Sequence, residues 1–232
     1  MSAIGISVKL YCRACGIELT RELTELTDRT RLCLEPEADF IPQGCFLYRE
    51  PDATTEDATA EDATTEDATT DGDSAAGGAG ARWIVINLQD LRQARPHADP
   101  ERLTGCCKLD GSAGINTCCA NGHEIGVQSS DCWMAHEFAF DESRVRGRRV
   151  LRYAVSAYKL DLGERWVDFL GELRLCDRSE LLAHIQSGQF ELDGIVWNDA
   201  ERIVTSRELR SGSIVHFQDM ELRFQHWVDA DD

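Results

Sequence analysis

The hydrophobic pattern of the chain predicts β-strands along much of its length. Residues 6–11 and 82–87 are rich in the β-branched and aromatic side chains that favour strands, and residues 150–158 follow the same pattern. Shorter strands are expected around residues 195–197, 214–218 and 221–227. No stretch approaches the roughly 18 consecutive apolar residues that a membrane-spanning helix needs.

Two helices are predicted in the second half of the chain. The first covers residues 164–175, where Trp166, Phe169, Leu170 and Leu173 recur at helical spacing. The second should begin at Asp177, because Asp177-Arg-Ser-Glu180 has the form of a capping box, and Gly188 can end it. Strands and helices that occupy separate parts of the chain indicate the α+β class.

An acidic repeat interrupts the first half. Residues 50–81 contain ten acidic residues and no basic one, which accounts for more than half of the formal net charge of −18. Within them, residues 52–71 repeat a five-residue unit that begins Asp-Ala-Thr. Such a segment can bury almost nothing, so we expect a disordered loop inserted into one domain. Residues 229–232 form an acidic tail. The negative net charge of the whole chain argues against broad non-specific nucleic-acid binding.

The ten cysteines favour thiolate ligands over disulfides. The first residues lack the basic start and the apolar run of a signal peptide, so we expect a cytoplasmic protein in which thiols stay reduced. We also expect no membrane partner.

Four cysteine and histidine clusters predict zinc sites. Cys12-Arg-Ala-Cys15-Gly16 has the form of a zinc knuckle, in which a tight turn lets two thiolates bind one ion. Two further pairs, Cys119–His123 and Cys132–His136, share a spacing of four, which places sulfur and imidazole on one face of a turn. Zinc usually takes four ligands, so eight candidates would fill two structural sites, and one site with four of them is the competing hypothesis. The candidates are Cys12, Cys15, Cys106, Cys107, Cys119, His123, Cys132 and His136.

Adjacent cysteines usually point apart, so Cys106 and Cys107 could serve different ions or leave one thiol unused.

The remaining cysteines have no matched partner. Small buried or surface thiols are the simplest interpretation of the others, which are Cys33, Cys45, Cys118 and Cys176.

Catalytic patterns are missing, and we predict no catalytic or cofactor-binding residue apart from the zinc ligands. His123-Glu124 begins like a zinc-protease helix motif, but Val127 stands where the second histidine is needed. The chain has neither a nucleophile elbow nor a phosphate-binding loop. Closed shells of cysteine and histidine are typical of structural zinc, so a non-enzymatic protein is favoured. The alternative is a zinc-dependent hydrolase of unfamiliar type that uses Glu124.

Residues 8–138 without the insert resemble bacterial zinc-ribbon-like proteins whose function we do not know. The resemblance rests on Cys12-x-x-Cys-Gly, the segment from Gly105-Cys-Cys-Lys-Leu-Asp-Gly to Asn116, Ser130-Asp-Cys-Trp133, and His136. It implies metal binding and a zinc-ribbon-like fold, and nothing more specific.

Residues 164–218 resemble the small RNA-binding domain of ribosomal small-subunit protein four and of the tyrosyl-tRNA synthetase C-terminus. The resemblance follows the two predicted helices, the strand and turn at Phe190–Gly194, and Leu209–Val215. The family usually has basic residues along the second helix and an Asn-Gly turn, whereas this chain has Leu181, Leu182 and Asp193-Gly194. The resemblance implies RNA contacts through Arg174, Arg178, Ser179, Arg207 and Arg210.

These observations divide the chain into a zinc-binding domain at 1–143, an arginine-rich connector and strand at 144–163, and an RNA-binding-like domain at 164–228. The leading hypothesis is a non-enzymatic zinc protein with an RNA- or ribosome-associated C-terminal module. The alternative of another class is a zinc-stabilised protein-interaction module without RNA binding. No small-molecule substrate is indicated.

Overall fold

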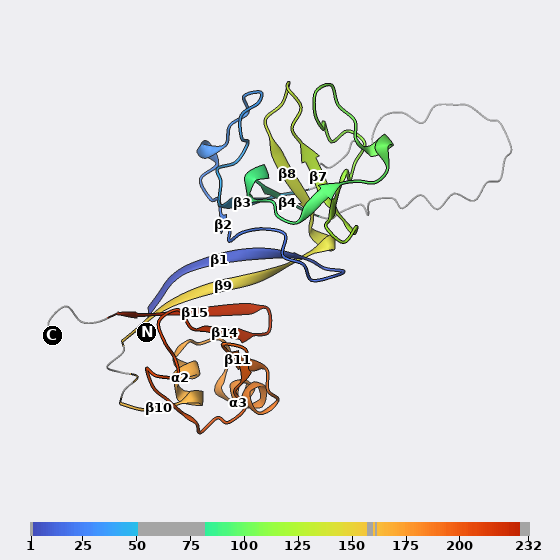
Figure 1. Cartoon of the computed structure of the whole chain (residues 1–232). Helices are drawn as coiled ribbons and strands as arrows, with labels where there is room; N and C mark the ends of the chain where they lie inside the picture. The colour runs from blue at the N-terminus through green and yellow to red at the C-terminus, as the bar shows by residue number, and fades with distance from the viewer. Residues whose placement is uncertain (1, 51–81, 157–159, 161, 228–232) are drawn as a thin grey trace, which may run out of the picture. The chain divides into compact units, whose positions relative to one another are not determined.

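The structure is a computed structural model that describes residues 2–50, 82–156, 160 and 162–227 (Figure 1). The acidic repeat that we expect to be disordered lies outside the described residues, as does the acidic tail. Contacts divide the chain into two compact units, which are described separately below. Unit 1 comprises residues 1–26, 90–93 and 146–232, and unit 2 comprises residues 27–89 and 94–145. The predicted α+β class is confirmed, because strands predominate and helices are few.

Unit 1 is built on a six-stranded sheet with the order β1-β9-β15-β14-β11-β12 (Figure 1). Strand β9 pairs in parallel with β15, whereas β14 is antiparallel to both β15 and β11. The strands are β1 (Ser2–Cys12), β9 (Val145–Ser156), β11 (Phe190–Leu192), β12 (Ile195–Val196), β14 (Ile214–Phe217) and β15 (Met220–Trp227). The strands predicted near the C-terminal end are therefore confirmed within a residue or two.

Two helices pack on this sheet. Helix α2 (Trp166–Glu172) lies inside the predicted range of 164–175 and is followed by α3 (Arg178–Gln186). Asp177 caps α3 by accepting a hydrogen bond from the Glu180 N–H, as the capping pattern predicts. Phe169 of α2 lies 5.6 Å from Phe224 of β15, measured between ring centroids. Strand β10 (Glu164–Arg165), directly before α2, pairs with β13 (Ile203–Val204), which comes after α3, and the two form a separate two-stranded sheet.

Residues 2–26 form a hairpin in unit 1. After β1 the chain turns at Cys12–Gly16 and runs back beside it, with antiparallel bridges Tyr11↔Glu18 and Val8↔Leu23. Leu10, Leu19 and Leu23 are buried. The sequence-based boundary at residue 143 kept this segment with the metal-binding half, whereas its contacts join it to residues 146–232. Hydrogen bonds between β1 and β9 explain the difference, because strand pairing joins residues that are far apart in sequence.

Unit 2 contains most of an antiparallel sheet with the order β2-β3-β4-β8-β7-β6-β5. Its centre is apolar, with Phe138 and Phe140 of β8 buried in edge-to-face contact. Gly126 is needed in β7, because a Cβ there would lie 2.2 Å from the Ala139 carbonyl oxygen. The strands are β2 (Thr24–Glu25), β3 (Cys45–Arg49), β4 (Trp83–Ile86), β5 (Ala94–Pro96), β6 (Thr117–Cys119), β7 (Glu124–Ser129) and β8 (Glu137–Asp141). Short 3₁₀ turns connect them at Arg29–Arg31, Leu88–Asp90, Pro100–Arg102 and Glu142–Arg144.

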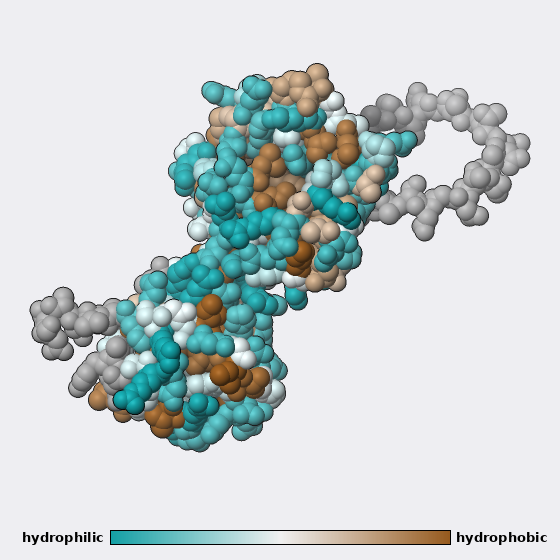
Figure 2. All heavy atoms as spheres, in the orientation of Figure 1, coloured by the Kyte–Doolittle hydropathy of each residue, from teal (hydrophilic) through white to brown (hydrophobic). Residues whose placement is uncertain are grey.

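The face shown in Figure 2 is mostly hydrophilic, and hydrophobic residues occur on it in small separate patches. Among the residues that the structure describes, no helix is both long enough and apolar enough to cross a membrane.

Candidate metal centre

The first pair of predicted ligands lies on the turn of the N-terminal hairpin in unit 1. The Cys12 N–H donates to the Ile17 carbonyl at 2.9 Å, and the Gly16 N–H donates to the Cys12 carbonyl at 2.8 Å. Gly16 has a φ of +73°, which a glycine adopts without steric cost. The turn is therefore closed by backbone bonds, as expected for a zinc knuckle. Cys12 is buried and Cys15 is exposed.

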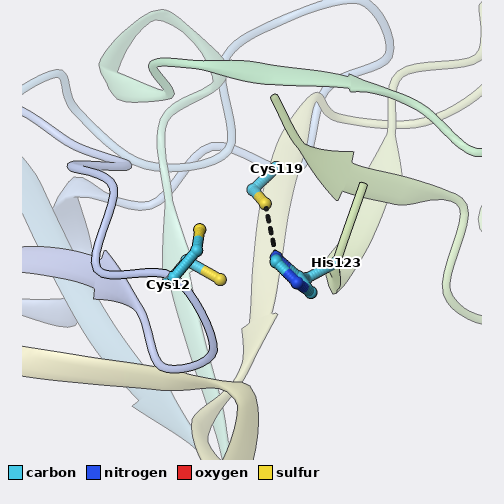
Figure 3. A group of neighbouring side chains, drawn as sticks. Cys12, Cys119 and His123 are labelled. Carbon is cyan, nitrogen blue, oxygen red and sulfur yellow. Dashed lines mark hydrogen bonds between the residues drawn. The ribbon is translucent and has the colours of Figure 1, made fainter. Parts of the chain in front are cut away.

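A second pair lies on a similar turn in unit 2, between β6 and β7. The Cys119 N–H donates to the His123 carbonyl, and the Gly122 N–H donates to the Cys119 carbonyl, each at 2.8 Å. Gly122 has a φ of +90°. The Cys119 Sγ lies 3.4 Å from the His123 Nδ1, the contact dashed in Figure 3. Both turns thus combine two potential ligands with one glycine in the left-handed region.

The two pairs form one candidate group. The three sulfurs and one imidazole nitrogen of Cys12, Cys15, Cys119 and His123 all lie within 4.8 Å of one another. Figure 3 shows Cys12, Cys119 and His123 as neighbouring side chains. Three thiolates and one imidazole are the donor set of a closed, four-coordinate zinc site. The group can hold a metal ion, and its chemistry fits zinc.

Three further predicted ligands form a second group, which lies entirely in unit 2. The sulfurs of Cys106, Cys107 and Cys132 lie within 4.8 Å of one another, and the first two are 3.9 Å apart. Cys106 and Cys107 are exposed, and Cys132 is partly exposed. We expected the adjacent thiols of Cys106 and Cys107 to point apart. They lie together instead, because the backbone here folds around a buried carboxylate.

That carboxylate belongs to Asp131, which is 0 % exposed and was not among the predicted site residues. Its Oδ1 accepts from the Cys132 N–H at 2.7 Å and from the Cys107 N–H at 2.9 Å, and its Oδ2 accepts from the Cys106 N–H at 2.5 Å. The Lys108 N–H and the Trp133 indole N–H also donate to it. Asp131 therefore fixes the backbone of all three cysteines. The only sequence signal for it is an aspartate directly before Cys132.

Glycine is also required in this loop. Gly105 has a φ of +141°, and a Cβ there would lie 1.8 Å from the Lys108 carbonyl oxygen. Any other residue would push the loop away from Asp131.

The ionisable groups of this loop shift one another's pKa values. The hydrogen bond from the Cys106 N–H, together with those from the other backbone donors, holds the pKa of Asp131 well below its usual range. The hydrogen bond with Cys107, followed by burial, raises the pKa of Cys132 to about 12. Cys107 also raises the pKa of Cys106. Crowding of sulfurs opposes their ionisation, and a bound cation would offset the repulsion between them.

The eighth predicted ligand belongs to neither group. His136 is bridged to Asp39, and its backbone N–H donates to the Ala38 carbonyl. Its Nε2 is buried without a hydrogen-bond partner. The predicted pairing of Cys132 with His136 on one ion therefore stays a prediction.

The other four cysteines, Cys33, Cys45, Cys118 and Cys176, also lie outside both groups. Burial raises the pKa of Cys118, which is buried in β6, and desolvation raises the pKa of Cys176. All ten cysteines are among the described residues, and none forms a disulfide.

Glu124, the residue on which the hydrolase alternative depends, is already held by bases of unit 2. Its carboxylate lies 2.8 Å from the Arg144 guanidinium and 3.3 Å from the His97 imidazole. A third partner, Arg102, lies 3.8 Å away. These contacts give Glu124 a structural role at the start of β7.

The residues expected to contact RNA are all exposed in unit 1. Arg178 pairs with Asp168 at 2.8 Å, and Ser179 donates to the Asp177 carboxylate at the start of α3. The Arg210 Nε donates to the Arg207 carbonyl at 3.1 Å. Arg174 follows α2 with a φ of +53°.

Comparisons with known proteins add no relative: no protein-family model, no curated protein and no solved structure matches the chain.

Proposed function

We propose that the chain is a non-enzymatic zinc-binding protein in which a structural zinc is held by Cys12, Cys15, Cys119 and His123. The observation that carries the proposal is the pair of glycine-containing hairpin turns, which together supply a complete set of three thiolates and one imidazole. Softer thiolate ligands favour zinc over magnesium or calcium, which prefer oxygen ligands. A shell of four protein ligands leaves no position for substrate, which supports a structural role.

Zinc-ribbon-like folding follows from the same two turns. Each turn offers only two ligands, so neither can satisfy a four-coordinate ion alone. Metal binding then contributes folding free energy to the segments that carry the ligands. A cytoplasmic location, where thiols stay reduced, fits this chemistry.

The proposal is tested by elemental mass spectrometry and a thiol count on the freshly purified chain. Cys119→Ala should remove one zinc per chain, because it deletes one ligand. Cys118→Ala is the matched control, since Cys118 is the neighbouring buried cysteine and belongs to neither group. A purified chain without zinc, or equal zinc loss in both variants, would refute the proposal.

We further propose that unit 1 binds structured RNA through its exposed arginines. Arg174, Arg178, Arg207 and Arg210 all present side chains to solvent near the end of α2, the start of α3 and the turn before β14. Guanidinium groups bind phosphate oxygens and position a protein on a nucleic acid without reading its sequence. The ion pair of Arg178 with Asp168 would compete with such a contact.

RNA binding should weaken as salt rises, with a log–log slope of about 0.7–0.9 per phosphate contact. The double variant Arg174→Ala, Arg207→Ala should then flatten the slope by nearly two such contacts, as measured by fluorescence anisotropy with a labelled RNA hairpin. Arg31→Ala, which removes an exposed arginine of unit 2, should leave the slope unchanged. Salt-independent binding, or none, would favour the protein-interaction alternative.

A further inference from the structure

The group of Cys106, Cys107 and Cys132 differs from the zinc group in its number of ligands. It supplies three thiols, and within the described parts of the chain no fourth histidine, cysteine, aspartate or glutamate joins it. Asp131 touches the same loop, but its two oxygens accept five N–H groups. Its carboxylate therefore serves the backbone, and the three sulfurs are the donors that remain.

The spacing of these sulfurs fits a shared ion. Metal–sulfur bonds of about 2.3 Å in a trigonal plane place the sulfurs roughly 4 Å apart. The Sγ atoms of Cys106 and Cys107 are 3.9 Å apart, and Cys132 completes the triangle within 4.8 Å. Asp131 and Gly105 fix the loop, so the contacts of the chain itself hold the three sulfurs at this spacing.

Solvent reaches this group freely. Cys106 and Cys107 are exposed and border a hollow of about 280 Å³, whose wall also includes Lys108, Leu109 and Gln128. The zinc group is half buried instead: Cys15 and His123 are exposed, whereas Cys12 and Cys119 are 1 % and 0 % exposed. An ion bound by the three thiols can therefore be delivered and removed without opening the fold.

We propose that Cys106, Cys107 and Cys132 form an open three-thiolate site for a soft cation, Cu(I), which exchanges with donors in solution. Thiolates select soft ions such as Cu(I), whereas structural zinc almost always takes a fourth ligand. The inference rests on the proposed function only in assigning zinc to the other group. It adds to a structural zinc protein the capacity to carry or sense a second metal.

The test uses the full chain loaded with zinc, kept free of oxygen and titrated with Cu(I) against a chromophoric Cu(I) chelator. We expect one copper to bind per chain with no zinc released. X-ray absorption at the copper edge should show three sulfur neighbours. Cys107→Ser should weaken copper binding more than about tenfold, since even the loss of a residue that only supports a ligand costs 10–100-fold. Cys33→Ser, which changes a partly exposed cysteine outside both groups, is the control.

Asp131→Asn tests the positioning role of the carboxylate. We expect copper affinity to fall about 10–100-fold while zinc content stays at one per chain, because Asp131 orients ligands without binding the ion. A variant that also loses zinc has lost its fold, and Cys107→Ser then decides.

The outcomes separate the two proposals. One zinc retained without copper binding overturns only the inference. Copper that releases an equal amount of zinc overturns it too, since the ion has then entered the other group. Two zincs per chain, with zinc coordinated by the three thiols and a fourth ligand, overturn the choice of copper. No zinc at all refutes the proposed function, whatever copper does.

Discussion

The two units differ in how much of their interior is apolar. In unit 1 the core around α2 and α3 is aromatic: Phe190 stacks on Phe217 at 4.1 Å, and Trp166 lies 5.0 Å from Trp197. Unit 2 has a smaller apolar sheet core, so buried polar residues such as Asn116 and Asp131 make up a larger share of its interior than Thr20, Asp90 and Glu221 do in unit 1. The Asn116 side chain bonds the backbone of Gln128 twice, at 2.8 and 2.9 Å, in the manner of a neighbouring strand.

This difference concerns where stability comes from. Apolar burial contributes about 25 cal/mol per Å² and needs no metal ligand, so we expect the helical core of unit 1 to stay folded when metal is removed. Buried polar groups stabilise only while every partner is in place. Unit 2 therefore depends on the loops that hold its ligands, and metal should matter more to it than to the helical core of unit 1.

Metal removal should produce the largest difference in stability between the two units. Zinc supplies on the order of 10 kcal/mol to the folding of small zinc domains. After chelation we expect backbone amides of β6 and β7, which flank the Cys119–His123 turn, to lose protection in hydrogen-exchange mass spectrometry. Those of α2 should stay protected.

The control for that experiment is the chelated chain with zinc restored, which should regain protection in both segments. Equal loss in α2 and β7 would show that the units unfold together, and unchanged protection everywhere would show that metal contributes nothing to either.

Trp166→Ala should produce the opposite pattern. Trp166 is fully buried against Phe169 and Trp197, so truncation should cost about 3–5 kcal/mol. We expect a lower denaturant midpoint, measured by circular dichroism, with zinc content unchanged. Ile195→Ala is the control, because Ile195 is 64 % exposed and its loss should have little effect. A variant that loses its zinc would contradict the expectation that zinc binding does not depend on the aromatic core of unit 1.

The smallest effect is expected from Asp177→Ala, which removes the cap of α3. The bond with the Ser179 hydroxyl, followed by that with the Glu180 N–H, lowers the pKa of Asp177. Loss of the cap should reduce the melting temperature by about 2–4 °C at neutral pH.

At low pH the melting temperatures of Asp177→Ala and the parent chain should become equal. Because the folded pKa is depressed, the stabilisation is complete above the unfolded value of about 3.9 and disappears as pH falls through the folded pKa. Melting curves of the variant and the parent chain should therefore converge at low pH. A gap that persists there would mean that the alanine acts through something other than the carboxylate charge.

Local patterns in the sequence predicted much of the secondary structure. The capping residues before Glu180 and the helical spacing after Glu164 are short-range signals, and both helices were confirmed. The parallel pairing of β9 with β15 left no such signal, because it joins residues about 70 positions apart, such as Leu151 and Leu222. Strand β9 also begins earlier than predicted, since the arginines at 146, 148 and 149 hid an exposed strand face.

The metal ligands could be found only in part for a related reason. Spacing identified the Cys12–Cys15 and Cys119–His123 pairs, because each fits within one turn. Which residues join Cys132 depends instead on Asp131, whose role follows from five N–H groups converging in space. An isolated aspartate carries no sequence pattern that announces such a role.

The position of β1 has a consequence for synthesis on the ribosome. This strand is made before unit 2, but its partner β9 is made only after residues 27–145 have been added. Unit 2 can thus complete its sheet before β9, the pairing partner of β1, has been made. Closing so long a loop slows folding. The edge of β1 that later pairs with β9 is in the meantime open to wrong pairing, so we expect mispairing to occur while residues 27–145 are being made.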